Sequence, residues 1–118
     1  MTHQAPPRPA PPGTDPGRQI AQLREALELV ERISGRAPAR GREALLDEAA
    51  RVSDAYDRAL PIVQRRFDTL AVETAAWAAA GVEALLVAGA SSPPRSAAMR
   101  LALRLDHALD ALKADIGL

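Results

Sequence analysis

Hydrophobic residues recur at intervals of three and four along most of the chain after residue 17. This spacing places them on one face of a helix and predicts a series of amphipathic helices. The first stripe consists of Ile20, Leu23, Leu27 and Val30. Asp15 is a favourable N-cap for this helix, Pro16 suits its first position, and Gly35 suits the residue just beyond its end. Arg24 is expected on the water-facing side, paired with Glu28 one turn later.

The second helical segment is predicted at residues 42–60. Its apolar positions keep the same rhythm and are Leu45, Ala49, Val52, Tyr56 and Ala59. Its outer face is predicted to be acidic, with Glu43, Asp47, Glu48, Asp54 and Asp57. Two of these acids have an arginine four residues later, so the pairs Asp47–Arg51 and Asp54–Arg58 are expected on the surface.

The stretch 61–89 is the longest and least charged of the predicted helices, and the other helices are expected to pack on it. Its inward positions follow a heptad pattern and are Val63, Phe67, Leu70, Thr74, Trp77, Gly81, Ala84 and Ala88. Many of its residues are alanine, which favours helix and lets neighbouring helices approach closely.

Pro61 sets the main question of topology. Proline removes a backbone donor and disfavours helix at the residue before it. The residues on both sides, however, are apolar and contain no turn former. We therefore predict one long helix over 42–89 with a kink near Pro61, and two helices that meet at a tight corner are the alternative.

Residues 89–94, GASSPP, interrupt the pattern, and Ser92 is a candidate N-cap for a last helix at 95–116. The inner face of that helix is predicted to consist of Ala98, Leu101, Ala102, Leu105, Leu109, Leu112 and Ile116. Met99 and Leu103 lie beside this stripe, so they leave apolar surface outside the core.

These elements predict an all-α protein, a small antiparallel bundle of three to four helices. One domain is expected at residues 18–118. Residues 1–17 contain six of the ten prolines and are expected to form a disordered tail. No pattern of strands or internal repeats is visible.

Charge and cysteine content narrow the class of protein. The chain has 15 basic and 15 acidic residues, a balance that argues against a dedicated nucleic-acid binder. It has no cysteine, which excludes disulfides and thiolate chemistry. No signal peptide and no transmembrane segment are expected, and the cytoplasm is the expected location.

No motif for catalysis, a cofactor or a metal is predicted. Phosphotransfer bundles carry a Lys-Gly pair soon after their histidine, whereas His107 is followed by ALDALK. Asp106 and Asp110 provide too few ligands for a closed metal site. Glu73 and Glu83 are interpreted as partly exposed carboxylates that each pair with an arginine, because lone buried acids are rare.

The functional hypothesis is a non-enzymatic protein–protein interaction module, a regulator or adaptor whose partner is another protein or a second copy in a homodimer. The predicted partner contacts are Met99, Leu103, Arg65 and Arg66. Two alternatives stay open. Gln64, Arg65 and Arg66 would begin a recognition helix in a nucleic-acid-binding regulator, and the apolar helices would suit a protein that coats lipid or polymer.

Overall fold

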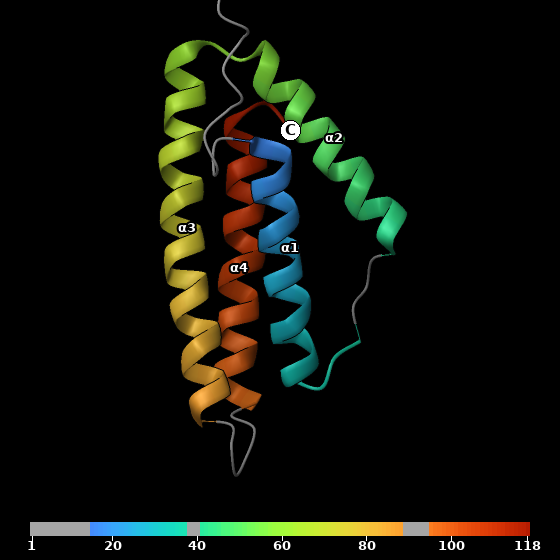
Figure 1. Ribbon diagram of the computed structural model, residues 1–118, viewed down its shortest axis with the longest axis vertical. Helices are drawn as coiled ribbons and strands as arrows, with labels where there is room; N and C mark the ends of the chain where they lie inside the picture. The colour runs from blue at the N-terminus through green and yellow to red at the C-terminus, as the bar shows by residue number, and fades with distance from the viewer. Residues whose placement is uncertain (1–14, 38–40, 89–94) are drawn as a thin grey trace, which may run out of the picture.

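The computed structural model describes residues 15–37, 41–88 and 95–118, which form four α-helices and, within these ranges, no β-strand (Figure 1). The helices are α1 (Pro16–Ile33), α2 (Arg42–Arg58), α3 (Pro61–Ala88) and α4 (Arg95–Asp115). The predicted all-α bundle is therefore confirmed. Most of the predicted tail and the candidate cap Ser92 lie outside the described residues, and residues 16 and 17 of that tail belong to α1.

The predicted ends of α1 are confirmed. The Asp15 carboxylate accepts a hydrogen bond from the backbone N–H of Arg18 at 3.2 Å, and Pro16 opens the helix. At the other end, Gly35 has a φ of +89°, a left-handed conformation that glycine adopts without a Cβ penalty.

Three helices, α1, α3 and α4, lie side by side, and α2 crosses the outside of α1 at an angle (Figure 1). α2 returns from the end of α1 to its beginning, so α3 starts beside the start of α1 and runs parallel to it. α4 runs antiparallel to both (Figure 1). The last helix therefore returns along α3, as the sequence predicts.

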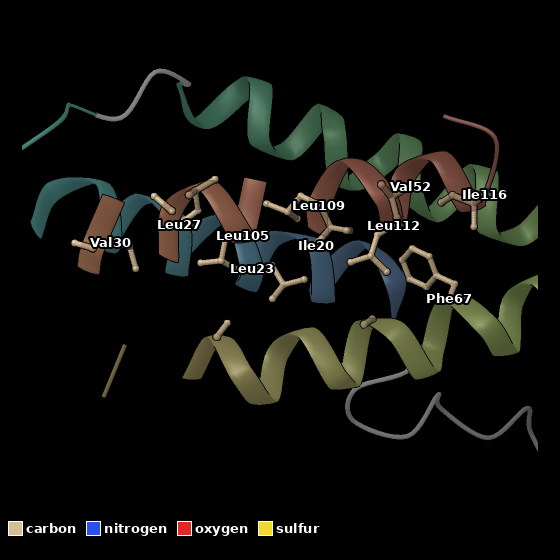
Figure 2. Packing of buried hydrophobic residues seen from close by; sticks show 14 of the residues in the cluster. Ile20, Leu23, Leu27, Val30, Val52, Phe67, Leu105, Leu109, Leu112 and Ile116 are labelled. Carbon is tan, nitrogen blue, oxygen red and sulfur yellow. The ribbon is translucent and has the colours of Figure 1, made fainter. Parts of the chain in front are cut away.

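The core lies between α1, α3 and α4, where branched aliphatic side chains of α1 and α4 interdigitate (Figure 2). α3 contributes Phe67 together with smaller residues such as Ala71 and Ala78. A Cβ at Gly81 of α3 would lie 2.8 Å from Cδ2 of Leu101. The small residues of α3 thus allow α4 to approach closely, as expected.

The predicted heptad pattern of α3 is correct in its first part and wrong at its end. Phe67 and Thr74 are buried, but Ala84 and Ala88 are exposed and Leu85 is buried in their place. A straight helix has 3.6 residues per turn, so a strict heptad pattern drifts by about 20° per repeat. α3 is long enough for this drift to move the buried stripe by one residue.

The prediction of one continuous helix across Pro61 is wrong, and the alternative corner is correct. α2 ends at Arg58 and α3 begins at Pro61. Ala59 has a ψ of 152°, an extended conformation, and Leu60 precedes the proline ring, which disfavours helix there. The apolar neighbours do not extend the helix, because proline has no backbone N–H to donate and its ring clashes with a helical conformation at Leu60.

The α2–α3 corner is held by polar contacts. The Tyr56 hydroxyl donates to Asp68, with 3.0 and 2.9 Å to its two oxygens, and the Gln64 amide donates to the Tyr56 carbonyl at 2.7 Å. The Tyr56 ring also meets Phe67 edge-on at 5.6 Å between centroids. Burial, together with the Asp68 carboxylate, raises the pKa of Tyr56 to about 12.

A titration of the single tyrosine tests this corner directly. We expect the ultraviolet absorbance of Tyr56 to change with a midpoint near 12, well above the value of about 10 for a free tyrosine. Asp68→Asn removes the negative charge beside the hydroxyl and should move the midpoint down toward that free value. A wild-type midpoint equal to that of free tyrosine would contradict the contact.

One face of α3 packs on the bundle and the other is exposed. By length and composition alone, α3 is able to cross a membrane, whereas the sequence pattern predicts no such segment. Only 22% of its most apolar 18-residue window is buried in the bundle. A single helix of this kind is weak evidence for a membrane span, but it identifies a large apolar surface without an intramolecular partner in the described residues.

Candidate functional site

A groove of about 480 Å³ lies where the end of α1, the start of α4 and Leu45 of α2 meet. We call it the α1–α4 groove. Both apolar residues that the sequence predicts as partner contacts, Met99 and Leu103, line it and are 55% and 61% exposed. Its full lining is Arg24, Leu27, Glu28, Glu31, Ser34, Arg36, Leu45, Met99, Arg100, Ala102, Leu103 and Asp106.

The charges around the α1–α4 groove balance. Three arginines and three carboxylates line it. The groove therefore offers no net charge to attract a polyanion or a polycation. Its apolar contribution comes from Leu27, Leu45, Met99 and Leu103 on three helices. Such a surface selects a ligand by apolar contact, with charged groups at the margin.

The second feature of this region is a buried ion pair between α1 and α2. Arg24 Nε and Nη2 donate to the two carboxylate oxygens of Glu48 at 2.7 and 2.8 Å. Lys113 of α4 donates to the same carboxylate at 3.1 Å, and Arg24 also lies 3.7 Å from Asp106. The side chains of Arg24 and Glu48 are each only 7% exposed. This pair fixes α2 against α1 and so places Leu45 at the groove.

These positions correct two predictions. Arg24 does not face water, and it pairs with Glu48 and Asp106 rather than with Glu28. Glu48 is buried and is not part of an acidic outer face. A signal was present in the sequence: Arg24 lies between Ile20 and Leu27 at intervals of four and three. Glu48 lies between Leu45 and Val52 at intervals of three and four. The surface pairs Asp47–Arg51 and Asp54–Arg58 are confirmed.

The environment of the pair determines its protonation. Burial alone would raise the pKa of Glu48, but the hydrogen bonds and charges of Arg24 and Lys113 outweigh it and lower that pKa to about 2. The hydrogen bond to Glu48, opposed by burial, raises the pKa of Arg24. Both groups are therefore charged at neutral pH, and the pair contributes structure rather than a proton-transfer group.

A close backbone approach adds to the α1–α2 contact. A Cβ at Gly17 would lie 2.5 Å from the Ser53 hydroxyl and 2.7 Å from the Ala49 carbonyl oxygen. The carbonyl is backbone and cannot move aside without shifting α2. Glycine is therefore required here for space.

Arg65 and Arg66, the other predicted contacts, lie at the start of α3, away from the groove. Arg66 forms an ion pair with Asp115 of α4 at 2.8 Å, which raises the pKa of its guanidinium. Arg65 is exposed and has no ion-pair partner among the described residues. Gln64 also donates a hydrogen bond to the Tyr56 carbonyl at the end of α2. Of the three residues of the nucleic-acid alternative, Gln64 and Arg66 are therefore engaged in contacts within the protein.

The remaining candidates for chemistry lie on the surface. His107 is exposed, in line with its interpretation as a solvated group. Glu73 and Glu83 are also exposed, but the expected arginine partner is found for neither of them among the described residues. Across residues 15–37, 41–88 and 95–118, no group of three or more metal-binding side chains is found. Trp77 is half-buried, with the Arg104 guanidinium 3.9 Å from its ring centroid, so the indole is covered by a cation rather than open to water.

Comparisons with the models of known protein families, with curated proteins and with solved structures found no match.

Proposed function

We propose that this chain is a non-enzymatic protein–protein interaction module that receives an apolar segment of another protein in the α1–α4 groove. The observation that supports this proposal is the groove itself, where Met99 and Leu103 are more than half exposed beside Leu27 and Leu45. An amphipathic helix presents apolar side chains at the spacing that a groove between helices accepts. A regulator or adaptor works through such a surface.

The charge pattern supports a protein as the ligand over nucleic acid. The groove lining carries equal numbers of basic and acidic groups, whereas nucleic-acid sites are strongly positive. Arg66, the second basic residue of the nucleic-acid alternative, is bound to Asp115.

Substitution in the groove tests this proposal. Leu103→Glu introduces a charge into the apolar contact and should weaken capture of the partner from the native cells by about tenfold or more. Leu60→Glu is the matched control, because Leu60 is 68% exposed and lies at the α2–α3 corner. Proteins captured by the wild type and the control, and lost from the Leu103 variant, are the expected result.

Equal capture by all three forms would overturn the groove assignment. Salt-dependent retention on DNA that is lost with Arg65→Ala would instead select the nucleic-acid regulator. Co-sedimentation with lipid vesicles, lost with Leu103→Glu, would select a protein that coats a lipid surface.

A further inference from the structure

The outer face of α3, turned away from the core, contains a second heptad pattern. It starts at Ile62, ends at Leu86 and includes Val72 near its middle, and these residues are 63%, 58% and 58% exposed. Steps of three and four connect all its positions, and each of them is exposed. A pattern of this kind over about 36 Å of helix is typical of a surface that pairs with another helix.

The order of residues along this face is self-complementary. When the helix is laid antiparallel on a copy of itself, Ile62 meets Leu86 and Arg65 meets Glu83. Toward the middle, Thr69 meets Ala79 and Val72 meets Ala76. All four pairs are symmetric about Thr74, as a two-fold axis through the centre of the helix requires.

Charge selects the direction of pairing. Arg65 and Glu83 are exposed, and neither has an ion-pair partner in the part of the chain that the structure describes. A parallel arrangement would place arginine against arginine and glutamate against glutamate. The antiparallel arrangement instead places two opposite-charge pairs at the two ends of an uncharged, small-residue centre. That centre allows helix axes to approach to about 8 Å.

We propose that the outer face of α3 docks antiparallel on the same face of a second copy of this chain, with Arg65 facing the partner's Glu83. The face is roughly 36 Å by 12 Å, some 400 Å² in projection. This is less than the roughly 800 Å² per partner that is usual in stable complexes. The dimer is therefore weak and reversible. The proposal concerns a different surface from the α1–α4 groove and does not depend on it.

Charge exchange tests the pairing by sedimentation velocity and light scattering, over roughly 1–500 µM protein. Arg65→Glu and Glu83→Arg each place two like-charge pairs in the dimer and should each weaken it by about tenfold or more. The double variant Arg65→Glu/Glu83→Arg exchanges the charges and should dimerise like the wild type. The two single variants, mixed in equal amounts, should form the heterodimer that neither forms alone.

Arg18→Glu, the same charge change at an exposed position of α1, is the control and should leave dimerisation unchanged. Unfolding of each variant at low concentration separates loss of pairing from loss of fold. A strict monomer across the concentration range, or a dimer that the single reversals leave unchanged, would overturn the proposal. So would binding of α3 to zwitterionic vesicles without self-association. None of these results affects the groove, since Leu103→Glu leaves this face intact.

Discussion

Arg24→Met is expected to lower the free energy of unfolding by about 3 kcal/mol, because it leaves the Glu48 carboxylate buried without its main partner. The two side chains join through hydrogen bonds of 2.7 and 2.8 Å and are each 7% exposed. Lys113 retains its bond to Glu48, which keeps the loss at the lower end of the range for broken buried pairs. Urea unfolding followed by Trp77 fluorescence measures the change.

Two further variants separate burial from charge. The double variant Arg24→Met/Glu48→Leu removes both charges and should regain stability to within about 1 kcal/mol of the wild type. Arg58→Met breaks a pair with a shorter distance, 2.6 Å to Asp54, but both partners are more than two-thirds exposed. It should cost less than about 0.5 kcal/mol. If Arg24→Met cost no more than Arg58→Met, the pair would be solvated rather than buried.

Acid provides a second measurement of the same pair. Because the pKa of Glu48 is lowered from 4.5 to about 2, the pair stabilises the fold fully above pH 4.5. This contribution is lost as the pH falls toward 2, when the folded protein must also protonate Glu48. In Arg24→Met the main cause of the lowering is gone, so the stability of this variant should depend less on pH over that interval.

The helices of this protein could be predicted from the sequence because their signals are local. Asp15, Pro16 and Gly35 define α1 through the chemistry of its own ends, and the inner face of α4 follows from periodicity alone. The prediction at Pro61 is wrong because the apolar residues on both sides favour a continuous helix, whereas the steric limit that proline imposes on Leu60 prevents one. The effect of proline on the preceding residue is a local signal, and the apolar residues on both sides of Pro61 obscured it.

The α1–α4 groove could be predicted only in part. Met99 and Leu103 were identified because they lie beside the stripe of their own helix. Leu45 completes the groove only through the angle of α2, and that angle depends on the Arg24–Glu48 pair and the space at Gly17. Charged residues at apolar positions are usually interpreted as surface positions. Here the two charged residues at apolar positions, Arg24 on α1 and Glu48 on α2, neutralise each other. The pattern of one helix alone does not reveal such a pair.

This arrangement links the stability of α2 to the proposed binding surface. Few side chains of α2 are buried, and Glu48 and Val52 are the ones nearly excluded from water. The helix is therefore held mainly by the ion pair of Glu48, by Val52 and by the contacts of Tyr56 at the corner. A change that loosens any of these three moves Leu45 and alters the groove without touching Met99 or Leu103.

Phe67→Ala is expected to cost about 3–4 kcal/mol, since it removes a fully buried aromatic ring and leaves a cavity. The ring also supplies the edge-on contact that ties Tyr56 of α2 to α3 at 5.6 Å. The loss should therefore be uneven, with amide hydrogen exchange accelerated more in α2 than in the centre of α4. Leu60→Ala, at an exposed site of the same corner, should change stability by less than about 0.5 kcal/mol. Uniform acceleration in all four helices would show that α2 unfolds only together with the rest of the bundle. In that case, loosening of α2 alone could not move Leu45 and alter the groove.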